Sequence, residues 1–381
     1  MKREPFGKVG RALLSASLRV LGSLVSLVSL VSLVSPSLLL TGTIARAGPA
    51  SSQQPLGQWE SGTLPEALAR AKASDRWVLV NVYATWCGPC HELDEKVFSR
   101  EDVAKTIAPQ FVAVRRDGEK DEGETIASRY HVVGYPTVLI LDASGTEVDR
   151  LMGFVPPREL LATLAQFRAG HGTLADFERK LAAAPGDETL KLEVANRHAL
   201  RGDARAVDEL NAIVKGDPDG KAKRAPAALL TLGKYYYLRG NKDYVAAERV
   251  LRDLEQRFGT SEEAGQVGYS LGLALHLQHK DQDAREVLDR WIAAAPKDVS
   301  RYSAYAWLSY KNDFDRARGI EVAKKGLEVD SKDHGLWDTL AELYGVTGKL
   351  VEARDAEKHA LAVKPDDNYY LAQLRRFGGG K

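Results

Sequence analysis

The sequence contains very little cysteine, because only Cys87 and Cys90 carry a thiol among 381 residues. They are three positions apart and no other pair exists, so the fold cannot rest on structural disulfides. Two cysteines are also too few for a structural zinc site, since no second C-x-x-C or H-x-x-x-H pattern supplies the remaining ligands. We therefore expect no metal site and no bound cofactor.

The sequence also lacks an excess of charge of either sign, with a formal net charge of +1. Residues 1–47 hold six basic residues and one acidic residue, so the net charge without them is −4. Neither value gives a reason to expect a nucleic-acid partner. Apolar residues make up 44% of the chain and charged residues 28%, which is ordinary for a globular protein, and the length predicts two or three domains.

A third absence lies near the N-terminus, where residues 20–45 contain no charged side chain. This apolar stretch follows a basic segment and leads to Ala45-Arg46-Ala47, a pattern typical of a secretory signal peptide. We predict a signal peptide over residues 1–47, cleaved after Ala47, and a linker over residues 48–57. An uncleaved membrane anchor is the alternative. Both interpretations place the rest of the chain outside the cytoplasm, in the periplasm or an equivalent compartment.

Residues 58–168 show the pattern of a sheet covered by helices. The run 77–83 is almost entirely apolar and rich in β-branched residues, which is typical of a strand buried on both faces. Periodicity and turn signals predict the remaining elements. We expect strands at 77–83, 111–114, 138–141 and 147–151, and helices at 63–74, 91–99, 126–130 and 157–167. This alternation predicts an α/β domain with helices on both sides of a central sheet.

The two cysteines lie where the first predicted strand gives way to a helix. A helix N-terminus presents unpaired N–H groups and the positive end of the helix dipole, and both stabilise a thiolate, which is the nucleophile of thiol chemistry. Pro89 has no N–H and suits the first helical turn. The setting predicts dithiol–disulfide exchange, with Cys87 exposed at the helix start as the nucleophile and Cys90 within its reach.

At this point the sequence resembles the thioredoxin superfamily. Residues 86–90 match its active-site motif, residues 134–137 match the loop that carries a cis-proline facing the active site, and Gly153 matches a glycine near the same surface. The resemblance implies a thioredoxin fold and a protein thiol–disulfide oxidoreductase. The implied catalytic residues are Cys87, Cys90 and Pro136, and the implied substrate contacts are Trp86, Gly88, Pro89, Tyr135 and Gly153.

Two positions concern the proton on the second cysteine. Asn81 stands where ordinary thioredoxins have a buried aspartate, six residues before the first cysteine, so that position offers no carboxylate base. Asp94 follows Cys90 by one helical turn and is a replacement acid. The segment 92–99 resembles the C-terminal domain of the electron carrier DsbD, which has an acid at this place. Asp94 is therefore a further candidate catalytic residue.

The cysteines also begin a Cys-x-x-Cys-His sequence, which is the attachment site of c-type haem. Under that interpretation Met152 is a candidate distal ligand. A small cytochrome has no need of a buried strand before the motif or of the Gly-Tyr-Pro-Thr loop after it. The order of the motifs therefore favours exchange chemistry over haem attachment.

Residues 170–377 are rich in helix-forming residues and contain an internal repeat. The clearest unit fits the roughly 34-residue tetratricopeptide (TPR) repeat, and weaker copies upstream bring the number to five. The resemblance implies an all-α superhelix that binds peptides or proteins on its concave face. Residues 235–237 are three tyrosines that are candidates for that face, although packing between repeats is the simpler explanation for most of them. The residues that define the clearest unit are Trp337, Leu340, Ala341, Tyr344, Gly348, Ala353, Ala360 and Pro365.

The motifs together predict an extracytoplasmic thiol–disulfide oxidoreductase whose repeats select its partners. The Gly-Pro pair between the cysteines favours a reductase or interchange role. Expected partners are proteins with disulfides or thiols, a protein or peptide ligand of the TPR array, and a membrane redox partner. The alternative is a scaffold or assembly factor in which the thioredoxin fold is only a docking module.

Overall fold

The computed structural model describes residues 59–378. The predicted signal peptide and linker lie outside these residues. None of the helices in the described part of the chain combines the length and the hydropathy of a membrane span.

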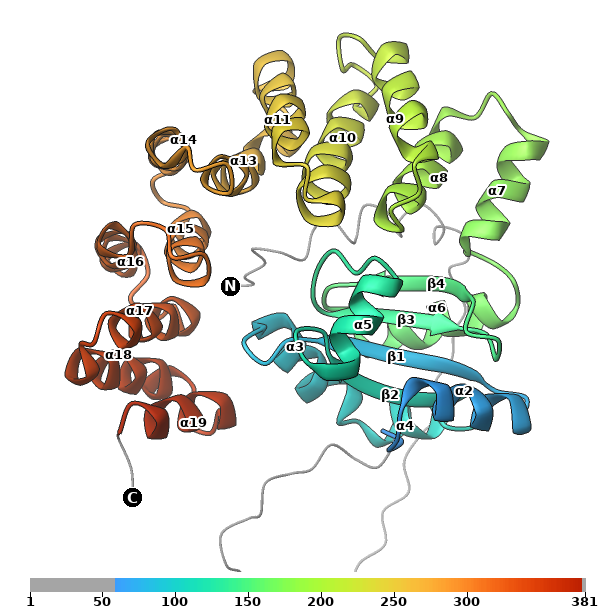
Figure 1. Ribbon diagram of the computed structural model, residues 1–381, viewed down its shortest axis with the longest axis horizontal. Helices are drawn as coiled ribbons and strands as arrows, with labels where there is room; N and C mark the ends of the chain where they lie inside the picture. The colour runs from blue at the N-terminus through green and yellow to red at the C-terminus, as the bar shows by residue number, and fades with distance from the viewer. Residues whose placement is uncertain (1–58, 379–381) are drawn as a thin grey trace, which may run out of the picture.

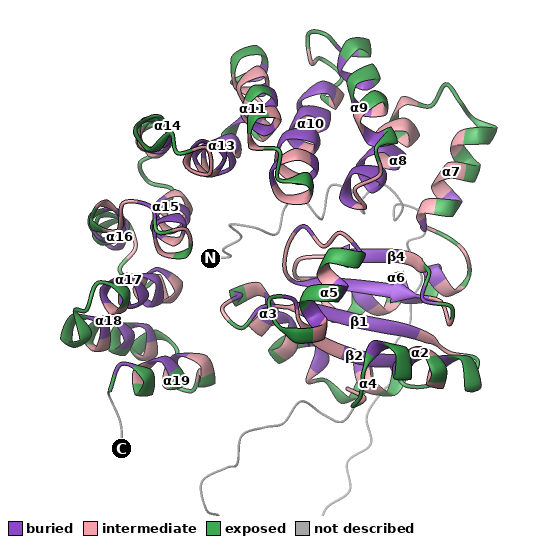
Figure 2. Ribbon diagram, in the orientation of Figure 1, coloured by how far each residue is buried: buried purple, intermediate pink, exposed green. Residues whose placement is uncertain are grey.

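A four-stranded sheet of order β2-β1-β3-β4 forms the centre of the first domain. Its strands are β1 (Trp77–Tyr83), β2 (Phe111–Asp117), β3 (Thr137–Leu141) and β4 (Glu147–Met152). β1 pairs in parallel with β2 and antiparallel with β3, and β3 pairs antiparallel with β4. Alternate side chains of β1 enter opposite cores, and β1 and β3 are buried along most of their length (Figure 2).

Helices cover both faces of this sheet (Figure 1). On one face lie α3 (Gly88–Leu93), the π-helical η2 (Asp94–Phe98), α4 (Glu101–Ile107) and α6 (Pro157–Arg168), and on the other lie α2 (Leu64–Ala73) and α5 (Asp121–Arg129). This arrangement confirms the predicted α/β thioredoxin fold.

Three elements of this domain differ from the sequence-based expectation, and one of them is α5, which begins at Asp121 and not at 126. The apolar pattern predicts a strand at 111–114, but β2 continues beyond it because Arg115 still pairs with Asn81 although its side chain is polar. The pattern does not predict α4, whose Val103 and Ile107 are buried one turn apart. Two apolar residues in a short polar segment give too weak a periodicity to be recognised.

The second domain follows helix α7 (Leu174–Ala183) and consists of helix pairs, five of them within residues 59–378. The helix α19 (Asn368–Arg376) comes after the last pair, and the short α12 (Glu262–Gly265) precedes the third. The pairs are α8 (Glu188–Leu200) with α9 (Arg205–Gly216), α10 (Arg224–Leu230) and the π-helical η3 (Thr231–Asn241) with α11 (Tyr244–Phe258), α13 (Val267–His276) with α14 (Asp281–Ala293), α15 (Val299–Lys311) with α16 (Arg316–Val329), and α17 (His334–Val346) with α18 (Leu350–Val363).

Small residues allow the two helices of a pair to approach closely. A Cβ atom on Gly233 would lie 2.7 Å from the side chain of Leu251, and one on Gly272 would lie 2.7 Å from that of Leu288. These positions therefore exclude any side chain larger than hydrogen. The helix pairing confirms the repeat architecture predicted from the spacing of small and large residues.

The helix array curves around the first domain (Figure 1). In each pair the first helix lies on the inner side of the curve, towards the sheet, and the second helix lies on the outer side. Side-chain contacts join the array to the first domain near β4 and again near α3. These two contacts are far apart on the first domain, and Arg239 of the array also contacts the loop before β3 between them in the chain.

The contact at β4 is a buried ion-pair cluster. Asp149 is fully buried and accepts hydrogen bonds from Arg197 at 2.6 Å and from Arg201 at 2.8 Å. It also accepts the backbone N–H of Leu174 at 2.7 Å. Because β4 is an edge strand of the sheet, this carboxylate attaches the start of the array to that edge.

We expect Asp149→Asn to destabilise the protein strongly. The variant keeps the shape of the side chain but leaves Arg197 and Arg201 without their central counter-charge. Urea denaturation should show a loss of about 3 kcal/mol in the free energy of unfolding. This value lies at the low end for a broken buried ion pair because Glu193 still pairs with Arg197 and Glu147 with Arg201.

The matched control is Asp102→Asn. It removes the same charge from an exposed pair with Arg100, so its unfolding midpoint should equal that of the wild type. Equal midpoints for both variants would contradict a stabilising role of the Asp149 cluster.

Candidate active site

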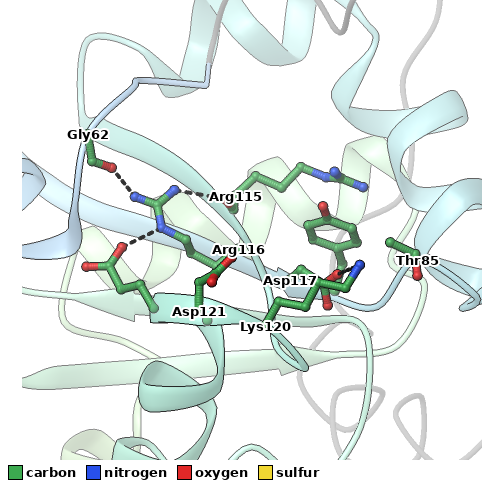
Figure 3. A pocket seen from close by; sticks show the side chains of 10 residues that line it. Gly62, Thr85, Arg115, Arg116, Asp117, Lys120 and Asp121 are labelled. Atoms are coloured by element: carbon green, nitrogen blue, oxygen red, sulfur yellow. Dashed lines mark hydrogen bonds and ion pairs between the residues drawn. The ribbon is translucent and has the colours of Figure 1, made fainter.

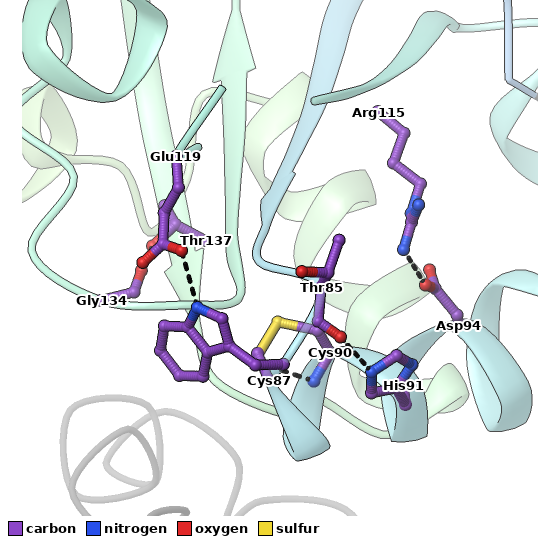
Figure 4. The surroundings of a disulfide bond; sticks show 10 residues. Thr85, Cys87, Cys90, His91, Asp94, Arg115, Glu119, Gly134 and Thr137 are labelled. Atoms are coloured by element: carbon purple, nitrogen blue, oxygen red, sulfur yellow. Dashed lines mark hydrogen bonds and ion pairs between the residues drawn. A yellow bond between two sulfur atoms is a disulfide. The ribbon is translucent and has the colours of Figure 1, made fainter. Parts of the chain in front are cut away.

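The two cysteines lie at the start of α3, directly after β1, and are joined by a disulfide (Figure 4). Cys87 is the N-cap of the helix, and its Sγ accepts the backbone N–H of Cys90 at 3.2 Å. Gly88 and Pro89 complete the first turn, with Gly88 exposed. The sulfur of Cys87 thus occupies the position at which a helix N-terminus stabilises negative charge.

The prediction that Cys87 is exposed is wrong. Its exposed fraction is 3%, and that of Cys90 is 1%. The side chains of Tyr83, Trp86 and Tyr135 pack against the pair. The covering ring of Tyr135 comes from a loop some 45 positions later in the chain, so the local sequence around the cysteines does not show the burial.

The loop before β3 lies beside the disulfide. Its Tyr135-Pro136 peptide bond is cis, and the carbonyl oxygen of Pro136 accepts the backbone N–H of Gly153 at 2.8 Å. The ring of Tyr135 meets that of Trp86 edge-on, with centroids 6.1 Å apart. Burial raises the pKa of Tyr135 to about 12, so its phenol stays protonated at neutral pH. The structure therefore brings the candidate residues of three separate motifs to one place.

Asp94 lies one helical turn after the cysteines and is paired with a basic side chain. Its carboxylate forms an ion pair with Arg115 of β2, and the guanidinium of Arg115 lies 3.3 Å from the centroid of the Tyr83 ring (Figure 4). Burial raises the pKa of Asp94, and the charge of Arg115 opposes that rise. The sequence analysis did not identify Arg115 as a site residue. Its position directly after the apolar run 111–114 is the signal that could have identified it.

The residue in place of the usual buried aspartate is also unusual. Asn81 is fully buried, and neither polar atom of its side chain has a hydrogen-bond partner among the described residues. It lies opposite Arg115 in the register of β1 and β2. The neighbouring strand β2 therefore carries a positive side chain, Arg115, opposite Asn81. The acidic side chain near the cysteines, Asp94, lies on the helix that follows them.

A polar pocket of about 440 Å³ adjoins Arg115 (Figure 3). It lies between the ends of β1 and β2 and the start of α5. Charged groups on its walls pair with one another: Arg116 donates to Glu122 at 2.7 Å, and Lys120 lies 3.6 Å from Asp117. Most of the charged groups that line this pocket are thus already paired with one another.

The haem alternative receives no support from the geometry. His91 Nε2 bonds the carbonyl oxygen of Thr85 at 2.7 Å, and a sulfur in the Cys87–Cys90 disulfide is not free to form a thioether. Met152, the candidate distal ligand, lies opposite Thr137 in the register of β3 and β4. Within residues 59–378, no three or more His, Cys, Asp or Glu side chains are placed to hold a metal ion.

The repeat array covers the disulfide from outside. Trp86 packs on Trp307 of α15 with ring centroids 5.1 Å apart, and Lys311 Nζ lies 4.3 Å from the centroid of Trp86. The indole N–H of Trp86 donates to Glu119 at 2.7 Å, and Glu119 lies 3.7 Å from Lys311. One tryptophan of the active-site motif is thus held by groups from both domains.

A second contact from the array reaches α3. The ring of Tyr369 in α19 lies 4.8 Å from that of His91. The site is therefore built from both domains, which separate analysis of each sequence motif does not predict.

Comparison with known proteins agrees with this geometry. Residues 58–143 match the protein family described as thioredoxin-like. This domain is thioredoxin-like. The chain is 30% identical over 106 residues to the thiol:disulfide interchange protein DsbD of Yersinia pestis, a match covering 26% of this chain and 18% of that protein. It is 35% identical over 88 residues to Thioredoxin-2 of Pyricularia oryzae, covering 23% of this chain and 47% of that protein. The chain thus spans less than half the length of both curated relatives.

Two solved structures resemble the two domains of this thioredoxin-like protein. A thioredoxin from Thermus thermophilus is 34% identical, covers 29% of this chain and 87% of its own, and gives a TM-score of 0.27. YrrB, described as a TPR protein with an unusual peptide-binding site, is 16% identical, covers 52% of this chain and 97% of its own, and gives a TM-score of 0.35.

We expect Trp307→Ala to make the disulfide more reactive. The substitution removes the ring that packs on Trp86, so a small thiol should reach the cysteines more often. Reduction by dithiothreitol, followed by acid quenching and alkylation, should be about twofold to tenfold faster, as expected for the loss of one aromatic contact.

Trp337→Ala is the control for that experiment. Trp337 belongs to the same array but stacks on His359, away from the cysteines. A wild-type rate in Trp307→Ala, or an equal acceleration in both variants, would contradict a covering role for Trp307.

Proposed function

We propose that this protein is an extracytoplasmic oxidoreductase that reduces or rearranges disulfides in other proteins. The observation that carries the proposal is the Cys87–Cys90 disulfide at a helix N-terminus, beside the cis Tyr135-Pro136 peptide bond. The extracytoplasmic location is supported by the basic, apolar and small-residue pattern of residues 1–47. In an oxidising compartment a disulfide-bonded pair is chemically stable.

The proposed reaction starts from the reduced pair. The thiolate of Cys87 attacks one sulfur of a client disulfide, forms a mixed disulfide, and displaces the other client sulfur as a thiolate that takes up a proton. Cys90 then loses its proton and attacks the sulfur of Cys87, which releases the second client thiol. Two electrons have passed to the client, and a dithiol donor must reduce the Cys87–Cys90 disulfide before the next cycle.

The residues around the pair have distinct roles in this proposal. The cis-proline loop binds the client backbone in an extended pose, as the resemblance to thioredoxins implies. Asp94, in its carboxylate form, accepts the proton of Cys90; burial raises the pKa of Asp94, and the charge of Arg115 opposes that rise. Trp86, Gly88, Pro89 and Gly153 form the surface on which the client lies.

The array acts as the client-binding part in this proposal. Trp307 and Lys311 contact the active-site tryptophan directly, so a protein bound to the inner side of the array is held next to the disulfide. This proximity favours an enzyme over the alternative of a scaffold with an inert thioredoxin-like domain.

The Cys90→Ala variant tests the exchange reaction. Without the resolving thiol the mixed disulfide on Cys87 cannot be released, so covalent adducts should accumulate and appear on a non-reducing gel. A variant with both cysteines replaced by serine should form none. If Cys90→Ala traps no client and the wild type reduces no disulfide probe, the enzyme proposal fails. Full biological activity of the double serine variant would favour the scaffold instead.

Arg115→Gln tests the role given to Asp94. The charge of Arg115 lowers the pKa of Asp94, so its removal raises that pKa and protonates the carboxylate at a higher pH. If the carboxylate accepts the proton of Cys90, the acid limb of the rate–pH profile should move up by about one pH unit. Arg116→Gln, which breaks a pair with Glu122 instead, should leave the limb in place. An unmoved limb in Arg115→Gln would remove Asp94 from the mechanism.

A further inference from the structure

The inner helix of the second repeat contains a π-helical segment, η3, over Thr231–Asn241. A π-helix forms i→i+5 hydrogen bonds and has a wider turn than an α-helix, so residues five positions apart point in more similar directions than they do in an α-helix. Lys234 and Arg239 have this spacing. In an α-helix the same two residues would point about 140° apart. The rare helix type therefore brings two positive side chains to the same side of η3.

Arg239 lies against the loop that carries the cis-proline. Its Nη1 donates to the carbonyl oxygen of Val133 at 3.4 Å, and a Cβ on Gly134 would lie 3.3 Å from the same nitrogen. The cis Tyr135-Pro136 peptide bond follows two residues after Val133. Arg239 of η3 thus contacts the segment next to the disulfide.

Lys234 and Arg239 have no acidic counterpart. Burial, together with the charge of Arg239, lowers the pKa of Lys234 to about 7, and within residues 59–378 no carboxylate pairs with either side chain. The near contact of Lys234 is the ring of Tyr235, with Nζ 5.0 Å from the ring centroid. A bound anion would favour the charged form of Lys234 and pair with the guanidinium of Arg239.

Two phenols complete the surroundings of Arg239. Burial raises the pKa values of Tyr235 and Tyr269, an effect that the charge of Arg239 opposes, so both lie within its electrostatic reach and remain protonated. Protonated phenols donate hydrogen bonds, as do the ammonium and guanidinium groups. Lys234, the adjacent Tyr235 and Arg239 therefore offer donors and positive charge, which is the chemistry that binds a carboxylate.

We propose that Lys234 and Arg239 bind an acidic side chain of the client, in an extended segment that lies along the Tyr135-Pro136 loop with its reactive cysteine at Cys87. The inference rests on the proposed function, because it concerns the client of the same site. It adds a specificity determinant: a client cysteine with a nearby Asp or Glu is preferred over one in a neutral segment. The array thus selects clients by charge at the reacting centre and not only by remote binding.

The test uses two synthetic peptides, each a disulfide-bonded extended segment, that differ only in Glu or Gln near the cysteine. The purified protein is reduced, and the kcat/KM for reduction of each peptide is measured at low salt. We expect a preference for the Glu peptide of about tenfold, which is the usual effect of one charge-assisted contact. In the variant Lys234→Gln/Arg239→Gln the ratio of the two values should fall to about one.

Two further variants make the result specific. Lys242→Gln removes one exposed positive charge immediately after η3 and should keep the preference, whereas general attraction of acidic peptides would be reduced in it. Arg239→Lys keeps the positive charge and should keep the preference for the Glu peptide. It therefore separates the loss of charge from a fold defect in the double variant. Equal kcat/KM values for both peptides in the wild type, or a preference that survives in Lys234→Gln/Arg239→Gln, would overturn the carboxylate site while the proposed function stands. Reduction of neither peptide, together with no trapped adducts in Cys90→Ala, would overturn the proposed function itself.

Discussion

The buried carboxylate of Asp149 is the interaction on which the arrangement of the two domains depends. It neutralises Arg197 and Arg201 where water cannot, and it lies on β4, the edge strand of the sheet. Removing a charge from such a cluster leaves its partners unpaired in a medium of low dielectric, which is costly. The start of the array is thereby fixed to one edge of the sheet, and the curvature of the repeats carries the inner face around to α3 (Figure 1).

A site built by two domains follows from that attachment. The disulfide and the cis-proline loop belong to the first domain, while Trp307 and Lys311 on one side and Arg239 on the other belong to the array. The cysteines themselves are buried by Tyr83, Trp86 and Tyr135 of the first domain, and the array contacts the outer side of Trp86. In our proposal a client therefore meets both domains at once, and the thiol chemistry is coupled to recognition by the repeats.

The sequence predicted the fold class and most of the elements because their signals are local. An apolar run, a helix start after Cys87 and the spacing of small residues in the repeats each lie within a short window. The helix α4 and the end of β2 escaped prediction because their stability comes from burial of two apolar residues and from backbone pairing with β1. The burial of Cys87 was not predicted for a related reason, because Tyr135, which packs against it, belongs to a loop far away in the sequence.

The sequence by itself determined the fold class and the position of the two cysteines at a strand-to-helix junction, because these features depend on residues close in the chain. Only the tertiary structure decided what surrounds those cysteines. The pairing of Asp94 with Arg115, the contact of Trp86 with Trp307 and the position of Arg239 against the loop join residues separated by 21, 221 and about 106 positions. The first contact depends on how the helix packs on the sheet, and the other two depend on how the repeats stack and where Asp149 holds them; no local pattern records that geometry.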